Sequence, residues 1–149
     1  MRLISHRGNV DGKYPQYENL PEYVDKALDL GYDVEVDLWI DNDGFYLGHD
    51  EPTYPIDLKW LTDRYLYLWI HCKDLRTVSK LRELQLDMLV NLNYFFHNTD
   101  DCTITSRGDL WVYPGKQPVK NSIAVMPEYH KDDISQAFAV CSDYIKNYK

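Results

Sequence analysis

The sequence predicts an α/β protein built as a reduced or incomplete TIM-type (β/α) barrel. Strand-like and helix-like segments alternate along the chain, which favours parallel strands with helices on the outer face. In the segment GYDVEVDLWI (31–40), hydrophobic residues alternate with Glu35 and Asp37. With the hydrophobic face against helices, both carboxylates would face the barrel interior. A full barrel of this type takes about 250 residues, so a chain of 149 residues predicts a reduced one.

Length and composition predict a single domain over residues 1–149. Hydrophobic residues make up 44% of the chain, enough for a folded core, and the formal net charge is −8. No basic run occurs, which argues against nucleic acid or an anionic membrane as the main partner. A phosphate-bearing ligand would need a few local cationic residues or a bound cation. Nothing in the sequence indicates an oligomeric state.

The cysteines indicate a reducing compartment. Cys72, Cys102 and Cys141 are odd in number and scattered, so a disulfide framework is not expected. The N-terminus leads directly into a strand pattern, and no apolar run has membrane-spanning length. These features predict a cytoplasmic protein with no integral membrane association.

The first fifty residues predict a strand, a helix and a β-hairpin. Asn19 and Glu22 form a capping-box pair at a helix start, and Gly31 stands where a helix stop belongs. The expected elements are a strand from Leu3, a helix between Asn19 and Gly31, the strand 31–40, a turn at DNDG (41–44) and an antiparallel return over 45–47.

The rest of the chain continues the alternation. Asp74 is expected to cap a helix that carries Leu75, Val78, Leu81 and Leu84 on one face. The other expected elements are strands over 65–74 and 86–93, short strands in TITS (103–106) and LWVYPG (110–115), a strand over 122–128, a final helix marked by Ile134, Ala137, Phe138 and Cys141, and a closing strand in CSDYI (141–145). No Gly-rich phosphate loop follows the first strand, which argues against a nucleotide-binding open sheet.

Polar side chains gather at the predicted carboxyl ends of the strands, where barrels of this type place their sites. Two carboxylates beside neutral imidazoles suit a hard divalent cation. Two histidines suit acid and base catalysis near neutral pH, while arginine and lysine suit the charge of a phosphate. Together they indicate phosphodiester cleavage. The residues concerned are His6, Arg7, Glu35, Asp37, His49, His71, Lys73 and Glu128.

Three segments carry a resemblance to a known family. SHRGN (5–9), ENLPEYVDKALDLGYDVEVDLWIDNDGFYLGHD (18–50) and LWIHCKD (68–74) resemble the glycerophosphodiester phosphodiesterase family, within the larger group of barrel-shaped phospholipase C-like phosphodiesterases. The CSDYI end (141–145) resembles the last strand of that family, whereas residues 75–140 match only in general layout.

The resemblance implies a role for each matching residue. His6 and His49 would be the catalytic acid and base. Glu35 and Asp37 would be ligands of a divalent cation, Ca or Mg. Two further roles are implied: Arg7 and Lys73 would bind phosphate, and Glu18 would support the site by holding Arg7.

His71 departs from the family pattern. The family usually offers an acidic metal ligand two residues before the strand lysine, here Lys73, and His71 occupies that position. The imidazole would therefore replace the carboxylate, or Glu128 would supply it, or the metal would be held loosely or be absent. His71 is also expected to contact substrate. Two alternatives stay open: a metal-independent, lyase-type phosphodiesterase that forms a cyclic phosphate, and a non-catalytic barrel that binds a phosphoester or polysaccharide.

Two further segments bear on substrate. The run FFHNTDD (95–101), with His97, Asp100 and Asp101, is expected to be a polar surface loop rather than an added metal or substrate loop. Trp111 is expected to fill the barrel at its rim and to contact substrate there. The substrate would be a small phosphodiester or a phosphodiester-containing polymer.

Overall fold

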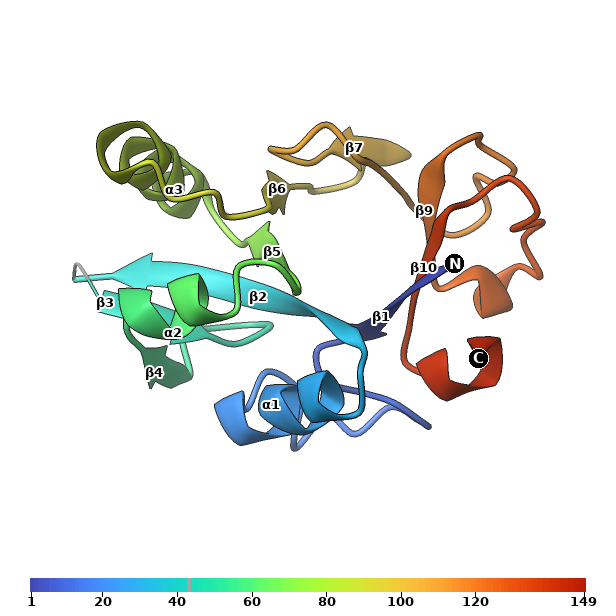
Figure 1. The fold of residues 1–149 in the computed structure, drawn as a ribbon, viewed down its shortest axis with the longest axis horizontal. Helices are drawn as coiled ribbons and strands as arrows, with labels where there is room; N and C mark the ends of the chain where they lie inside the picture. The colour runs from blue at the N-terminus through green and yellow to red at the C-terminus, as the bar shows by residue number, and fades with distance from the viewer. Residues whose placement is uncertain (43) are drawn as a thin grey trace.

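Strand β2 (Asp33–Asp41) organises the sheet, which Figure 1 shows from one end. The computed structural model describes residues 1–42 and 44–149, so Asp43 of the expected DNDG turn lies outside the described residues. One edge of β2 pairs in parallel with β1 (Arg2–His6), and the other with β5 (Leu68–Cys72). Its far end pairs antiparallel with β3 (Gly44–Leu47), which confirms the expected return of the hairpin.

The ten strands found in the described residues form one curled sheet, a half-barrel in a mixed α/β fold. Eight of them follow a single path, and β5 leaves it at β2 and leads to β6. The remaining strands are β4 (Tyr54–Ile56), β6 (Tyr94–Phe96), β7 (Cys102–Ile104), β8 (Leu110–Val112), β9 (Ser122–Val125) and β10 (Ala139–Ser142). The path runs β4-β3-β2-β1-β10-β9-β8-β7, so β1 and β10, at opposite ends of the sequence, are neighbours in the sheet.

The two ends of the curl approach each other at β6 and β7. The backbone N–H of Ser106 donates to the carbonyl of Tyr94 at 2.7 Å, and the hydroxyl of Thr103 donates to the carbonyl of Phe96 at 2.9 Å. In the described part of the chain these strands share no ladder. In a closed barrel, paired strands would join the two ends of the sheet. Here isolated hydrogen bonds join them.

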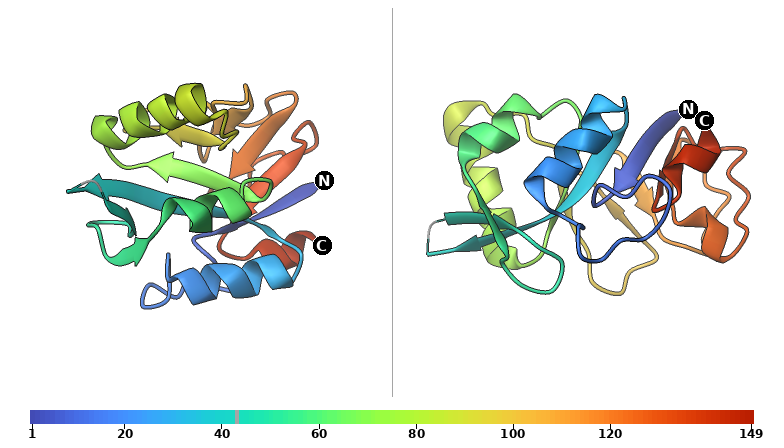
Figure 2. Two further views of the ribbon diagram at one scale, coloured as in Figure 1. Left: turned by 60° about the vertical axis from the view of Figure 1, so that its left-hand side comes forward. Right: turned by 90° about the horizontal axis from the view of Figure 1, so that it is seen from below.

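Helices cover the outer face of the β2 half of the sheet, as Figure 2 shows. They are α1 (Pro21–Asp29), α2 (Leu58–Asp63) and α3 (Leu75–Met88). Val34, Val36 and Leu38 of β2 pack in one buried cluster with Val24 of α1 and Leu81 of α3. The outward hydrophobic face predicted for this strand is therefore confirmed.

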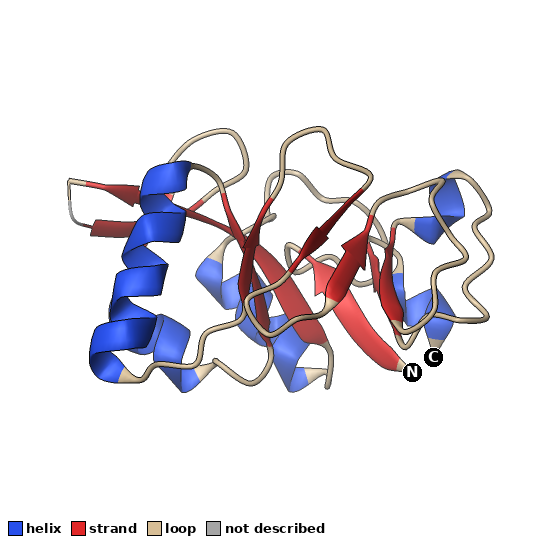
Figure 3. Ribbon diagram, turned by 90° about the horizontal axis from the view of Figure 1, so that it is seen from above, coloured by secondary structure: helices blue, strands red, loops and turns tan. Residues whose placement is uncertain are grey.

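The other half of the sheet has lighter cover. Two short 3₁₀ turns, η1 (Pro127–Tyr129) and η2 (Ile145–Tyr148), cover this half, and Figure 3 shows short helical turns near the C-terminus. Ile145 packs with Val140 and Ala124 of these strands. Among residues 1–42 and 44–149, every helix is too short or too polar to span a lipid bilayer.

A second cluster fills the inside of the curl. Ile4, Trp69, Phe95, Trp111 and Ile123 are buried together there. Large side chains from five strands therefore occupy the interior, as packed barrels require.

An ion pair lies at the N-terminal side of the interior. Arg2 pairs with Asp33, whose carboxylate also accepts a 2.8 Å hydrogen bond from the indole N–H of Trp69. These contacts satisfy the carboxylate of Asp33, which lies at the N-terminal end of β2, far from the carboxyl ends of the strands.

The strand expected over 86–93 is wrong. Helix α3 continues to Met88, and Leu89, with φ 54, ends it in the left-handed conformation. The alternating pattern of this segment also fits a helix, and leucine and methionine are strong helix formers. The Asp74 cap is confirmed by its 2.8 Å bond from the N–H of Thr77. The strand of this region is β6, at Tyr94–Phe96.

The final helix is also wrong. Ile134 and Ala137 flank a single turn, closed by a 3.0 Å bond from the N–H of Ala137 to the carbonyl of Ile134, and Cys141 lies inside β10. Strand β10 joins β1 to β9, so its ladder bonds on both edges outweigh a weak helical pattern. Strand β4 and helix α2 were not expected from the sequence.

Candidate functional site

A cavity of about 380 Å³ opens at the carboxyl ends of the parallel strands. Most of the site residues expected from the sequence line it, and Asp37 lies buried beside Arg7. The expected residues in the lining are His6, Arg7, Glu35, His49, His71, Lys73 and Trp111. The strand-end rule therefore brings together side chains from β1, β2, β5 and the loop after β3.

The register of β2 sets the pairing of the polar groups. Glu35 lies beside His6 of β1, and Asp37 lies beside His71 of β5. Because side chains alternate along a strand, both carboxylates point inward while their hydrophobic neighbours point outward. Glu35 is 2% exposed and Asp37 is 0% exposed. The acidic face is therefore buried, which requires compensating partners.

Asp37 has those partners. Its carboxylate lies 2.8 Å from Nε of Arg7, 3.1 Å from Nδ1 of His71 and 3.5 Å from Nζ of Lys73. Nδ1 of His49 lies 3.5 Å away on the open side. Burial alone would raise the pKa of Asp37, but hydrogen bonds from His49 and His71 and the charges of Arg7 and Lys73 hold that pKa well below its usual range. Asp37 is thus the ionised carboxylate of the pair.

Asn19 makes two further hydrogen bonds with Asp37, a role that the sequence did not suggest. Its Nδ2 donates to the carboxylate at 2.9 Å, and its Oδ1 accepts the backbone N–H of Asp37, also at 2.9 Å. The expected helix cap is therefore wrong: the N-cap is Leu20, without a side-chain cap bond. Asn19 adopts φ 65, a conformation that asparagine tolerates better than most residues.

Glu35 behaves in the opposite way. Burial and the charge of Asp37 raise its pKa well above the usual range, and Arg7 and Lys73 offset this only in part. Its Oε2 lies 3.8 Å from Nε2 of His6 and has no hydrogen-bond partner in the described chain. One carboxylate is charged and the other favours a proton, which is a common outcome for two acids that share a buried space.

His6 is held from behind by Asp143, which the sequence reading did not single out. Its Nδ1 lies 2.7 Å from Oδ1 of Asp143, and Nδ2 of Asn9 donates to the same oxygen at 2.7 Å. Burial lowers the pKa of His6, and the hydrogen bond to Asp143 works against that shift. Asp143 directly follows β10, so the strand-end rule could have found it.

Arg7 is fixed by the turn after β1. Its Nη1 donates to Glu18 at 3.1 Å, and Asn9 donates to the other oxygen of Glu18 at 3.0 Å. Glu18 therefore holds Arg7, as expected. Arg7 has φ 56 and Gly8 has φ 94, so the backbone turns sharply at this point. A Cβ on Gly8 would lie 2.6 Å from the ring of Tyr23, which explains the glycine.

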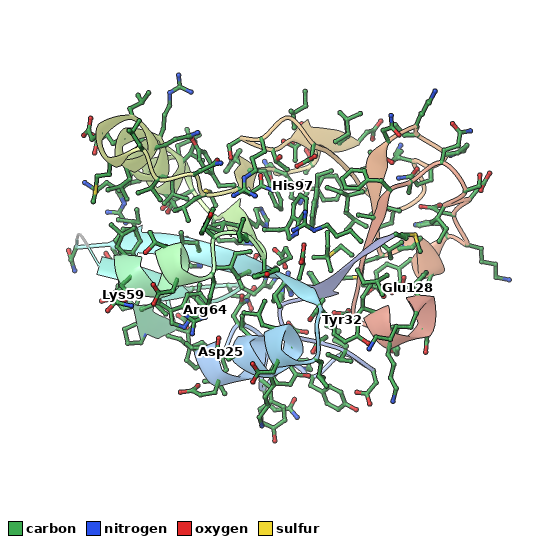
Figure 4. The ribbon with its side chains drawn as sticks, viewed as in Figure 1. Asp25, Tyr32, Lys59, Arg64, His97 and Glu128 are labelled. Atoms are coloured by element: carbon green, nitrogen blue, oxygen red, sulfur yellow. The ribbon has the colours of Figure 1, made fainter. Side chains whose placement is uncertain are left out.

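Glu128 is the one expected metal ligand that the structure directs elsewhere. Its carboxylate accepts hydrogen bonds from the hydroxyls of Ser142 at 2.7 Å and Tyr148 at 3.0 Å. The strand before it ends at Val125, Met126 adopts φ 45, and η1 carries Glu128 to the flank of β10. In Figure 4 Glu128 lies beside the C-terminal segment, away from His97. Glu128 does not complete the acidic group.

His71 supplies the third donor in its place. Donor atoms of Glu35, Asp37 and His71 all lie within 4.8 Å of one another. Nδ1 of His71 lies 3.9 Å from Oε1 of Glu35 as well as near Asp37. A set of two carboxylates and one imidazole, with an unpaired oxygen on Glu35, fits a divalent cation.

Aromatic rings form the opposite wall of the cavity. The rings of His71 and Phe95 stack with centroids 5.2 Å apart, and those of His97 and Tyr113 stack at 3.8 Å. Trp111 lies behind Phe95 at 4.6 Å and is 2% exposed, so it forms the floor more than the rim.

The loop expectation for 95–101 is wrong for His97, which lines the cavity. Burial, reinforced by the nearby His71, lowers the pKa of His97 to about 4, so this ring is neutral at physiological pH. Asp101 instead pairs with Lys116 at 3.0 Å, and Asp100 accepts the N–H of Asn98 at 3.3 Å. The second half of the segment is therefore a polar surface loop, as expected.

Neither protein-family models nor curated proteins nor solved structures gave a match to this chain. The geometry of the cavity is therefore what a functional assignment has to rest on.

Proposed function

We propose that this protein cleaves a phosphodiester, with His6 and His49 as the acid and base pair. The observation that carries the proposal is that both imidazoles line one cavity with Arg7 and Lys73, around a buried carboxylate pair. Two cations suit a phosphate that bears one negative charge, and two histidines suit the two proton transfers of its cleavage.

His6 is the better base. Asp143 accepts the Nδ1 proton of its ring, which leaves Nε2 free to take a proton from the attacking hydroxyl. His49 is the more exposed ring, and its Nδ1 lies 3.5 Å from the carboxylate of Asp37. It would protonate the leaving oxygen.

A divalent cation held by Glu35, Asp37 and His71 would neutralise the acidic pair and polarise a phosphate oxygen. Arg7 and Lys73 would bind the remaining phosphate oxygens. Glu18 and Asn19 would keep Arg7 and Asp37 in place.

A metal-independent reaction is the second candidate, favoured by the surroundings of Asp37. Arg7 and Lys73 already lie within 3.5 Å of that carboxylate, so two fixed cations compensate it without a metal. In such a reaction a neighbouring hydroxyl of the substrate would attack the phosphate, the bond from phosphorus to the other alcohol would break, and the products would be a cyclic phosphate and that alcohol. A non-catalytic binder has no use for the His6–Asp143 pair, which counts against that alternative.

We also propose that the curled sheet is an incomplete TIM-type barrel related to the glycerophosphodiester phosphodiesterases. The inward acidic face of β2, the parallel neighbours on both of its edges and the site at the strand ends support this relation. The three cysteines are unpaired, which suits the cytoplasmic location expected from the sequence.

Hydrolysis of bis(p-nitrophenyl) phosphate tests the proposal. The wild type should release nitrophenol, and His6→Ala and His49→Ala should each lose most of the rate, about 100-fold or more. Lys80→Ala on the outer helix α3 is the control and should keep full activity. Activity that survives both histidine substitutions would sink the mechanism. Activity that a chelator leaves unchanged would show that the reaction does not require a metal.

A further inference from the structure

A cavity of about 380 Å³ lies between α1, η2 and the loop that follows β1, and we call it the α1–η2 cavity. Figure 1 shows α1 and the C-terminal turn on the same side of β1. Within the described chain this cavity shares no lining residue with the cavity at the strand ends. Gly8 lines the α1–η2 cavity and Arg7 lines the other, so the turn after β1 separates the two.

Backbone contacts hold the walls of the α1–η2 cavity together. The N–H of Lys146 in η2 donates to the carbonyl of Val10 at 3.0 Å. The N–H of Gly12 donates to the carbonyl of Asp143, also at 3.0 Å. The loop after β1 is therefore fixed to the C-terminal segment, and the cavity is preformed, as small-molecule sites usually are.

The open part of the wall is aliphatic. Val10 and Ala27 contribute to it, and Leu30, at the end of α1, is 58% exposed. Covering such a leucine with an apolar group is favourable, because apolar surface is removed from water. The cavity therefore offers a place for the apolar part of a ligand.

The aromatic rings of the lining are already in contact with other groups. The ammonium of Lys149 lies 4.6 Å from the ring centroid of Tyr32, which is itself 3% exposed. The ring of Tyr23 lies 5.6 Å from that of Tyr17, and its hydroxyl donates to Oδ1 of Asn9 at 3.3 Å. An alkyl chain therefore finds more free surface here than a flat ring does.

Exposed lysines provide most of the charge around the cavity. Lys26 comes from α1 and Lys146 from η2, while Asp11 is the acidic side chain of the lining. The lysines that form ion pairs in the described residues lie elsewhere, and Lys26 and Lys146 are not among them. Acidic residues outnumber basic ones by 24 to 16 in this chain, so two unpaired lysines at one cavity favour an anionic ligand.

We propose that the α1–η2 cavity binds a small anion with a single alkyl chain, such as the carboxylate of a fatty acid. The chain would cover Val10, Ala27 and Leu30, and the anionic head would pair with Lys26 and Lys146. A neutral alkyl compound would leave the lysines unpaired, and a compact anion such as phosphate would leave the aliphatic wall in water. The inference uses no step of the proposed function.

Isothermal titration calorimetry with monomeric decanoate tests the inference. The wild type should bind one decanoate per chain. Octanoate should bind about tenfold more weakly, because it buries two fewer methylene groups. Decyltrimethylammonium has the same chain length and a cationic head, and it should also bind at least about tenfold more weakly than decanoate.

Leu30→Asp should weaken the binding of decanoate by about tenfold or more, because it removes aliphatic surface and adds a negative charge. Leu86→Asp is the matched control and should bind as the wild type does. Leu86 is also an exposed leucine near the end of a helix, α3, and lies outside the cavity.

The two lysines are tested by neutral substitutions that leave the wall intact. Lys26→Gln should weaken binding about threefold, and Lys26→Gln combined with Lys146→Gln about tenfold. Lys80→Gln, on α3, is the control for an exposed lysine and should have no effect. Lys73→Ala distinguishes the two cavities, because Lys73 lines only the one at the strand ends, and it should bind decanoate normally.

Four results would overturn the inference. They are no binding of decanoate by the wild type, equal binding of decyltrimethylammonium, loss of binding in Lys73→Ala alone, and binding that Leu30→Asp and the double lysine variant both leave unchanged. Circular dichroism checks the fold of each variant before titration. If Leu30→Asp does not fold, the double lysine variant decides alone.

Discussion

Nδ1 of His6 lies 2.7 Å from Oδ1 of Asp143, although 137 positions separate the two residues along the chain. Strands β1 and β10 are paired in parallel, with Ser5 beside Ser142, so His6 at the end of β1 meets Asp143 directly after β10. The contact fixes the tautomer of His6 and leaves Nε2 for the cavity. It therefore links the first and last strands of the sheet to the chemistry proposed for the site.

Replacing Asp143 by Asn should impair catalysis without unfolding the protein. The carboxylate raises the pKa of His6, against the lowering by burial, so its loss should lower that pKa further. The acid limb of the kcat/KM profile should then move to lower pH, and the plateau should fall by about 100-fold because the tautomer is no longer held. Asp63→Asn, on the exposed side of α2, is the control. An unchanged profile for Asp143→Asn would show that His6 is not the base.

Metal binding should depend on Glu35 and His71 but not on Glu128. Because imidazole ligands favour transition metals, Zn²⁺ should raise Tm more than Ca²⁺ does. Glu35→Gln and His71→Gln should abolish the increase. Glu128→Gln should retain it, because that carboxylate bonds Ser142 and Tyr148 instead. Thermal unfolding monitored by circular dichroism measures the increase in Tm. If the Zn²⁺-dependent increase were lost only in Glu128→Gln, that result would contradict the assignment.

Asn19→Ala should lower the free energy of unfolding by about 3 kcal/mol: about 2 kcal/mol for the two hydrogen bonds to buried Asp37 and about 1 kcal/mol for alanine in a left-handed backbone. Exposed Asn121 has a similar backbone conformation, with φ 54 against φ 65 for Asn19. Asn121→Ala is therefore the matched control for the backbone and should cost about 1 kcal/mol. Urea denaturation compares the two. Equal losses would mean that the bonds to Asp37 contribute nothing.

Gly8→Ala should be more damaging than Gly31→Ala. Both glycines have positive φ, 94 and 86, so both changes strain the backbone. Only at Gly8 would the new Cβ meet another atom, the ring of Tyr23 at 2.6 Å, while nothing lies within 4 Å at Gly31. We expect Gly31→Ala to lower the free energy of unfolding by about 1 kcal/mol, and Gly8→Ala to lower it by roughly 1–3 kcal/mol more. Tyr23→Ala should rescue part of the loss at Gly8 and none of the loss at Gly31.

Much of the site followed from two local rules. The period of two in β2 placed Glu35 and Asp37 on the inner face, and the strand-end rule grouped His6, His49 and Lys73 with them. Both rules use only neighbours along the chain, and parallel strands bring their ends together without further information.

The failures have causes that the hydrophobic pattern does not contain. Asn19 has the chemistry of a helix cap, but a buried carboxylate 18 positions away uses its side chain instead. Glu128 seemed to end an inward strand, yet a left-handed residue at Met126 turned the chain aside before it. Segment 86–93 fitted strand and helix alike, and only the continuation of α3 decided between them. The local sequence pattern does not show which side chain, backbone turn or neighbouring element determines the structure at these positions.

The register of strand β2 determines both the packing of the hydrophobic core and the position of the acidic residues. Its outward residues belong to the largest buried cluster, and its inward residues are the acids of the cavity. A slip of one position would turn the hydrophobic residues inward and the acids outward at the same time. Lost activity and lost folding should therefore go together for variants that shift β2. Variants in the loops that carry Arg7, His49 and Asp143 should be able to lose activity alone, and with it to change substrate, while the sheet stays intact.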